Sequence, residues 1–99
     1  MMTRGQRLPS LDMPRTDRAA IAAYVRASGD DNPLHSDIDT AQRAGFSDVL
    51  VPGMMVQGQM AEILANWAPT GRIQSFDARF VLPIPIDSDL RFEGRVAAL

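Results

Sequence analysis

The segment from residue 53 to residue 67 limits most strongly how this chain can fold. On a helical wheel it has one narrow polar stripe, formed by Gln59, Glu62 and Asn66, and apolar side chains cover most of the remaining circumference. A helix with so little polar surface is expected to be surrounded by protein. Gln57 lies opposite the stripe, so we expect a buried, hydrogen-bonded amide there unless the sheet leaves that face open.

Two shorter helices are predicted before the long one. The first spans 16–28 with Thr16 as its N-cap, and the glycine that follows it ends it. The second is capped by Ser36 or Asp37 and ended by Gly45. Its inward-facing residues are expected to be Ile38, Ala41 and Ala44. The residues before the first helix form a short segment that can be extended.

After the long helix the hydrophobic period changes from 3.6 to 2. Alternating apolar and polar residues over 76–82 and 90–98 predict two antiparallel strands joined by the PIPIDSD connection. Pro83 and Pro85 cannot donate to a strand ladder, so they belong at a strand end or an edge. We therefore expect one domain over residues 1–99, of the α+β class, with an antiparallel sheet wrapped around the long helix.

Composition excludes several classes of function. Ten basic residues, all arginine, against 12 acidic ones give a net charge of -2, which argues against binding to nucleic acid or to an anionic membrane surface. The chain has no cysteine, no lysine and one histidine, which excludes a thiolate nucleophile, a lysine Schiff base and a Cys-ligated or His-rich metal site. No apolar run has the length of a membrane span or the form of a signal peptide, so a cytoplasmic location is expected.

The residues with catalytic potential gather in the segment SGDDNPLHSD, residues 28–37. Asp30 and His35 can converge there, because Pro33 stiffens the loop between them and restricts Asn32 to extended conformations. A carboxylate that takes a proton from water, beside an imidazole that orients this water or supplies a second proton, is what adding water to a polarised double bond requires. An ordinary turn between two helices would explain the same residues.

Residues 24–55, YVRASGDDNPLHSDIDTAQRAGFSDVLVPGMM, resemble the MaoC-like dehydratases and (R)-specific enoyl-CoA hydratases. The family signature is an Asp, any residue, Asn-Pro, an aliphatic residue and His, and a His-Gly-Met segment follows downstream. Residues 78–96, ARFVLPIPIDSDLRFEGRV, also look like the family's Arg-Phe strand and the strand after it. The first half of the signature is matched at every position, by Asp30, Asn32, Pro33, Leu34 and His35. The resemblance implies a hotdog fold, and we expect the family's last strands to be absent from it here.

Carried over to this chain, the resemblance makes Asp30 and His35 the catalytic pair, without a metal or an organic cofactor. It implies that the backbone N–H of Gly53 contacts the thioester carbonyl, a role that suits the free N–H groups and partial positive charge of a helix N-terminus. A simple strand-to-helix turn would also explain Gly53. Asn32 is assigned to substrate binding, and holding the loop by side-chain hydrogen bonds is favoured over a direct substrate contact.

Three positions depart from the family pattern. Pro52 replaces the usual His before the Gly-Met pair, Gly58 replaces a Ser found in some (R)-hydratases, and the sequence stops at Leu99, where the family continues. Two hypotheses therefore stand. One is a lyase of fatty acid metabolism that interconverts trans-2-enoyl and (R)-3-hydroxyacyl thioesters of CoA or of an acyl carrier protein, working as a homodimer or hetero-oligomer. The other is a non-catalytic or truncated hotdog subunit that binds an acyl thioester or pairs with a complete partner.

Overall fold

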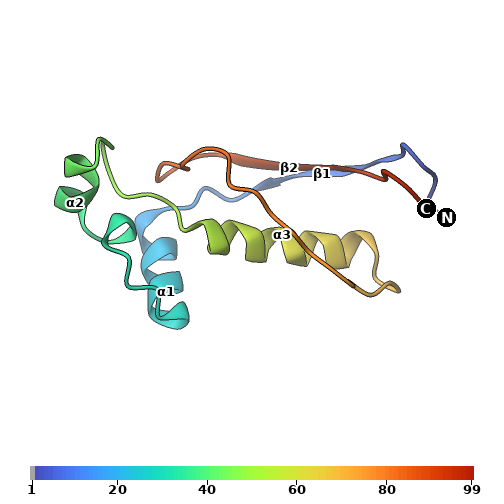
Figure 1. Ribbon diagram of the computed structural model, residues 1–99, viewed down its shortest axis with the longest axis horizontal. Helices are drawn as coiled ribbons and strands as arrows, with labels where there is room; N and C mark the ends of the chain where they lie inside the picture. The colour runs from blue at the N-terminus through green and yellow to red at the C-terminus, as the bar shows by residue number, and fades with distance from the viewer. Residues whose placement is uncertain (1) are drawn as a thin grey trace.

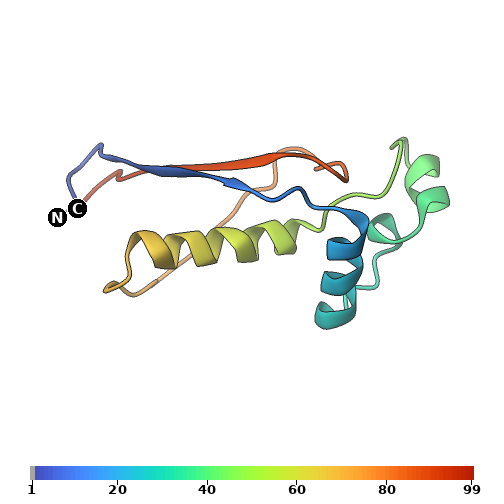
Figure 2. The ribbon, with the colours of Figure 1, turned by 180° about the vertical axis from the view of Figure 1, so that it is seen from behind.

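The computed structural model describes residues 2–99, which form a two-stranded antiparallel sheet and three α-helices. The sheet runs along the longest helix, and the two shorter helices lie beyond one end of it (Figure 1). Seen from behind, both chain ends lie at the opposite end of the sheet (Figure 2). The elements in chain order are β1 (Arg7–Met13), α1 (Arg18–Ser28), the short 3₁₀ turn η1 (Pro33–His35), α2 (Ile38–Arg43), α3 (Gly53–Trp67) and β2 (Leu90–Arg95).

Helix α1 begins one residue later than predicted. Its N-cap is Asp17, whose carboxylate accepts a hydrogen bond from the N–H of Ala20 at 2.9 Å. The expected cap, Thr16, is instead buried, and its carbonyl accepts from the N–H of Asp87 at 2.9 Å. The prediction for the other end is confirmed, because Gly29 ends the helix with a φ of 73°, in the left-handed region that favours glycine.

Helix α2 is capped by Asp37, one of the two predicted candidates. Ala41 is buried as expected, but Ile38 and Ala44 are exposed, so the prediction of inward-facing residues was wrong for two of the three. A six-residue helix makes fewer than two turns, so most of its positions lie near an end where nothing covers them.

Helix α3 has the predicted bounds, but it is not surrounded by protein. Within residues 2–99 only two of its side chains, Val56 and Ile63, are buried, and Met54 is 59% exposed. Gln57 is half-buried with no hydrogen-bond partner for its amide among the described residues, so the expected buried, bonded amide is not found. In the predicted polar stripe, the side-chain oxygen of Gln59 is buried and has no hydrogen-bond partner within residues 2–99.

The sheet pairs β2 with β1, not with the segment 76–82. Leu11 faces Phe92 and Met13 faces Leu90, and the register shifts between Leu8 and Leu11. The predicted alternation along β2 is confirmed, since Phe92 is buried between exposed neighbours. The predicted strand over 76–82 was wrong, because alternation shows which face of a strand would be covered and a ladder also needs a neighbouring backbone.

Pro85 lies outside a regular ladder, as expected of a proline. It forms an isolated antiparallel bridge with Leu50, and hydrogen bonds join Val51 N–H to Ile84 O at 2.8 Å and Ile86 N–H to Val49 O at 3.3 Å. These contacts hold the chain just before α3 against residues 84–86. Across residues 2–99, no helix is both long enough and apolar enough to cross a membrane.

The hydrophobic core lies where α1, α3, β2 and the chain before α3 meet. Trp67 also ties the far end of α3 to the sheet, because its indole N–H donates to the carbonyl of Pro9 at 3.1 Å. The buried members of the core are Ile21, Val51, Val56, Ile63 and Phe92. This core places the loop before α2 beside the start of α3.

Candidate active site

The loop between α1 and α2 is folded by its own polar side chains. Asp30 Oδ1 accepts the N–H of Asn32 at 3.1 Å, and Asn32 Oδ1 accepts the N–H of Leu34 at 3.0 Å. Pro33 opens the turn η1, and the N–H of His35 donates to the carbonyl of Asn32 at 3.1 Å. Asn32 therefore has the loop-holding contacts expected of it, since both its main chain and its side chain are engaged within the loop.

The structure brings Asp30 and His35 together. Asp30 Oδ2 lies 3.8 Å from His35 Nε2, and the side chains are 32% and 13% exposed, respectively. The distance is too long for a direct hydrogen bond. Because Asp30 Oδ1 is occupied by the loop, Oδ2 is the oxygen left to act together with the imidazole. The two atoms are close enough for one water molecule to contact both.

The other ring nitrogen of His35 is fixed by the main chain. His35 Nδ1 lies 2.8 Å from the carbonyl oxygen of Leu50. A carbonyl can only accept, so this contact assigns the proton to Nδ1 and leaves a lone pair on Nε2 when the ring is neutral. The N–H of Leu50 in turn donates to the carbonyl of Leu34 at 2.9 Å, which ties the two segments together in both directions.

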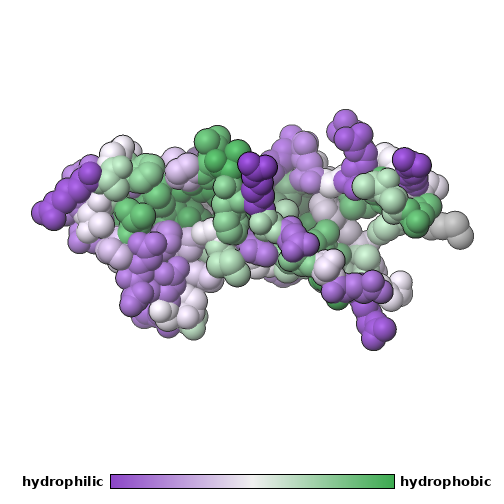
Figure 3. Space-filling view, in the orientation of Figure 1, coloured by the Kyte–Doolittle hydropathy of each residue, from purple (hydrophilic) through white to green (hydrophobic). Residues whose placement is uncertain are grey.

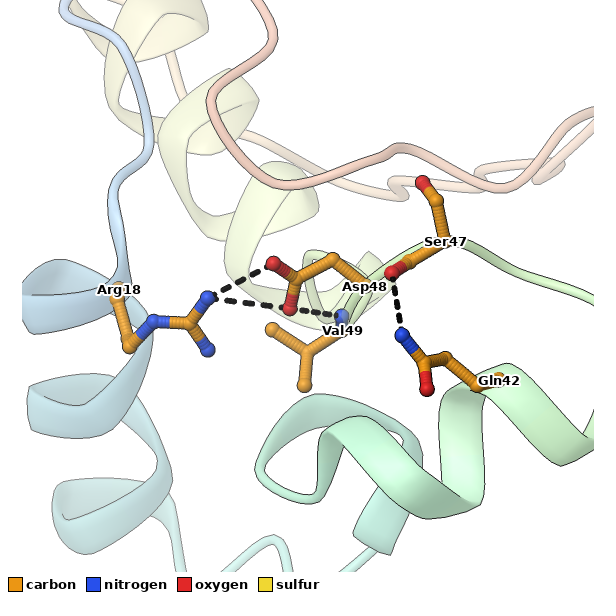
Figure 4. Close-up of polar contacts among 5 residues, drawn as sticks. All are labelled: Arg18, Gln42, Ser47, Asp48 and Val49. Atoms are coloured by element: carbon orange, nitrogen blue, oxygen red, sulfur yellow. Dashed lines mark hydrogen bonds and ion pairs between the residues drawn. The ribbon is translucent and has the colours of Figure 1, made fainter.

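An ion pair anchors the segment that carries this carbonyl. The Arg18 guanidinium contacts both oxygens of Asp48, at 2.8 and 3.1 Å, and Asp48 Oδ1 also accepts the N–H of Val49 at 2.6 Å (Figure 4). These two donors, the backbone N–H first and Arg18 second, lower the pKa of the Asp48 carboxyl. One residue earlier, the side-chain amide of Gln42 donates to the carbonyl of Ser47 at 3.3 Å.

Gly53 is the first residue of α3 and follows Leu50 by three positions, which limits their Cα separation to about 11 Å. Within residues 2–99, no acceptor meets the backbone N–H of Gly53 or Met54, as is usual at the start of a helix. A Cβ on Gly53 would lie 3.1–3.2 Å from ring atoms of Phe80. This close approach gives Gly53 a structural reason to lack a side chain, whatever its N–H contacts.

A groove of about 370 Å³ lies beside His35, between α1 and the turn η1. Its lining residues are Arg18, Ala22, Val25, Arg26, His35 and Ser36. No group of three or more metal-ligating side chains occurs in the part of the chain that the structure describes.

Three contributors to the site were missed in the sequence. The carbonyl of Leu50 is a main-chain group, and no side-chain pattern marks it. The Arg18–Asp48 pair joins residues 30 positions apart, and Phe80 was expected within a strand. These contacts depend on tertiary packing rather than on local sequence.

Residues 3–98 match the family described as MaoC like domain. The chain belongs to this family. Two solved structures share the fold of this MaoC-like chain, a hotdog, which confirms the predicted fold. The ChsH1-ChsH2 complex from Mycobacterium tuberculosis gives a TM-score of 0.86 at 27% identity, over 100% of this chain and 78% of that chain. The (R)-hydratase from A. caviae involved in PHA biosynthesis gives 0.83 at 30% identity, over 99% and 74%.

Curated relatives of the MaoC-like chain include two plant proteins. The mitochondrial 3-hydroxyacyl-acyl-carrier-protein dehydratase of Solanum lycopersicum is 34% identical over 79 residues, which are 80% of this chain and 48% of the relative. The corresponding Arabidopsis thaliana protein is 36% identical over 70 residues, which are 71% and 42%. The chain thus spans about half the length of the curated relatives it matches.

Proposed function

We propose that this chain carries the catalytic loop of a hydratase or dehydratase that interconverts trans-2-enoyl and (R)-3-hydroxyacyl thioesters. The observation that carries the proposal is the approach of Asp30 Oδ2 to His35 Nε2, 3.8 Å apart, while Asp30 Oδ1 and His35 Nδ1 are already bonded. Two acceptor atoms at this separation can each receive a hydrogen bond from one water molecule, leaving the water's lone pairs toward a substrate.

In the hydration direction, the water oxygen bonds to C3 of the enoyl group while Asp30 takes one of its protons. His35 orients the water, because its Nε2 lone pair accepts and does not donate while Nδ1 holds the ring's proton. Protonated Asp30 then gives the proton to C2, which restores the carboxylate and completes addition of H and OH across the double bond. The reverse sequence eliminates water.

Negative charge develops on the thioester oxygen between these two steps. We assign its stabilisation to the backbone N–H of Gly53, which has no described acceptor and lies at the positive end of the α3 dipole. Asn32 acts by holding Asp30 and the turn η1 in place. The proposed chemistry needs no metal or organic cofactor.

The relatives support an acyl thioester as substrate. Two are named as dehydratases of 3-hydroxyacyl groups on acyl carrier protein, and one solved neighbour is named as an (R)-hydratase. We propose a CoA or carrier-protein thioester and a homo- or hetero-oligomeric assembly for this chain, with a role in fatty acid metabolism.

A second candidate is a binding subunit that pairs with a complete partner. The exposed segment 76–82 favours it, because Val81 and Leu82 are 76% and 77% exposed next to the ring that covers Gly53. One solved neighbour is also a complex of two differently named chains.

Substitution of the catalytic pair tests the enzyme proposal. Asp30→Asn keeps the acceptor for the Asn32 N–H but removes the base, so the rate of hydration is expected to fall about 100-fold or more. His35→Ala should cause a similar loss, and the double variant should lose little more, because both groups act on one water. Asp31→Asn is the matched control, since this neighbouring carboxylate is exposed and outside the proposed site.

The assay follows the loss of the conjugated thioester absorbance with crotonyl-CoA, a longer enoyl-CoA and the same acyl groups on a carrier protein. Thermal melts of each variant test whether the fold is retained. An active Asp30→Asn variant would remove this aspartate from the mechanism. Wild-type protein that binds these thioesters without turning them over would favour the second candidate.

A further inference from the structure

Asp30 and Leu50 compete for the single ring proton of neutral His35. If the proton lay on Nε2, the ring could donate to the charged carboxylate of Asp30 once the two groups closed from 3.8 Å to hydrogen-bond distance. On Nδ1, it donates to the neutral carbonyl of Leu50 at 2.8 Å. Hydrogen bonds to ionised acceptors are generally the stronger ones. The observed arrangement therefore depends on holding the Leu50 carbonyl close to the ring.

Main-chain bonds of Leu50 N–H to Leu34 and of Val51 N–H to Ile84 hold this carbonyl, and the residues just before it add a side-chain anchor. The Asp48 carboxylate links its own segment to α1, because it accepts hydrogen bonds both from the N–H of the buried Val49 and from Arg18 on α1 (Figure 4). Within the described residues, this ion pair is the only polar side-chain contact from α1 to the chain over 47–51, beside the apolar packing of Ile21 in the core that includes Val51. The link on the α2 side is the longer bond from Gln42 to Ser47.

We propose that Arg18 and Asp48 are positioning residues that set the tautomer of His35. By fixing the main chain at residues 48–50 against α1, the ion pair keeps the Leu50 carbonyl at Nδ1. The lone pair then stays on Nε2, where it can accept from water. Without the ion pair, the proton moves to Nε2 and bonds Asp30 directly, so neither group is free to hold water. The consequence for catalysis rests on the proposed function; the tautomer itself does not.

The chain offers a clear readout, because His35 is its only histidine. In protein labelled with ¹⁵N, the imidazole nitrogen shifts give the ratio of the two neutral tautomers without overlap from another ring. Wild type should be mainly the Nδ1–H form. Arg18→Gln and Asp48→Asn should each move the ratio toward Nε2–H by about five-fold, the size expected when one hydrogen bond of ordinary net strength is weakened. Where wild type is active, kcat should fall with the Nδ1–H fraction.

A matched control exists in the chain just before α1. Arg15 and Asp89 also form a two-contact ion pair, at 3.2 Å, which has no link to residues 47–51. Arg15→Gln and Asp89→Asn should leave the tautomer ratio of His35 unchanged. A shift of the same size in these controls would overturn the proposal, because it would show a general effect of lost surface charge.

Wild-type protein gives a second measurement that needs no substitution. At about 1 M salt the screening length falls to about 3 Å, which weakens an exposed ion pair, so the ratio should move in the direction of the two variants. Folded Arg18→Gln and Asp48→Asn proteins with the wild-type ratio would refute the inference. So would a wild-type ratio insensitive to salt, or a wild-type ring in the Nε2–H form. Inactive wild type with the expected tautomer response would refute only the proposed function.

Discussion

Gly94 lies on β2 at the point where the ring of Trp67 packs against the sheet. A Cβ at this position would be 2.7 and 2.8 Å from two atoms of the indole ring and 3.3 Å from Leu8 Cδ1. The ring cannot retreat freely, because its N–H donates to the carbonyl of Pro9. The glycine thus allows the far end of α3 to pack against the sheet.

Gly94→Ala is expected to lower the free energy of unfolding by about 1–3 kcal/mol, the usual effect of forcing an extra methyl group into a packed contact. Fluorescence of the single tryptophan during denaturant unfolding measures it directly. Gly58→Ala is the matched control. No atom lies within 4 Å of its Cβ position inside α3, so alanine should stabilise the helix by about 1 kcal/mol. Equal effects of the two substitutions would contradict this account.

Single residues also mark how far the site could be predicted. Asp30, Asn32 and His35 were identified because a short loop brings side chains of a recognisable pattern together. The Leu50 carbonyl and the ring of Phe80 reach the site through tertiary packing, and a main-chain carbonyl leaves no mark in a pattern of residue types. Local sequence therefore identifies the candidate side chains of the site but not the groups that orient them.

At the scale of elements, the predictions succeeded where a segment's own pattern decides the outcome. The bounds of α3 follow from its helical period, and the end of α1 follows from Gly29. The predicted strand over 76–82 was wrong because no strand lies beside this backbone. Strand β2, its expected partner, pairs with β1 instead. The prediction that α3 is buried all round was wrong for the same reason, because a helical wheel does not show how much of the helix a sheet covers.

Helix α2 depends on a titrating cap. Asp37 accepts from the N–H of Asp39 at 3.0 Å and from the hydroxyl of Thr40 at 2.9 Å. The Thr40 hydroxyl is the main cause that lowers the pKa of Asp37 below its ordinary value of 3.8. A lowered carboxyl pKa adds stability that is fully present above the ordinary value and is lost as the pH falls through the lowered one.

We therefore expect Asp37→Ser to make the protein less sensitive to acid. Serine caps a helix without titrating, so the melting temperature near pH 7 should change little, and its decline below about pH 4 should be smaller than in wild type. Asp37→Ala provides the comparison, because it removes the cap at every pH and should already melt lower near pH 7. Thermal melts from pH 7 to pH 2.5 measure both. Parallel profiles for wild type and Asp37→Ser would contradict the role of this carboxylate.

The whole molecule is long and thin, with extents of 50 × 23 × 21 Å. Its radius of gyration is 15.7 Å, against about 13 Å for a compact domain of 100 residues. Apolar side chains interrupt the polar surface on the face seen in Figure 3. After the C-terminal Leu99, the most exposed large apolar side chains of the described residues are Val81 and Leu82, in a segment whose backbone joins no strand. Such a segment presents both apolar surface and unpaired backbone groups to a neighbouring chain.

The described residues should therefore associate in solution. We expect a homodimer or larger species by light scattering at micromolar concentration, since pairing would cover the 76–82 backbone and part of α3. Leu82→Ser should shift the population toward monomer and lower the melting temperature. Leu99→Ser is the matched control, because Leu99 is similarly exposed but lies outside this segment. A monodisperse wild-type monomer with a cooperative melt would show that the exposed segment needs no partner, and equal dissociation by both substitutions would place the contact elsewhere.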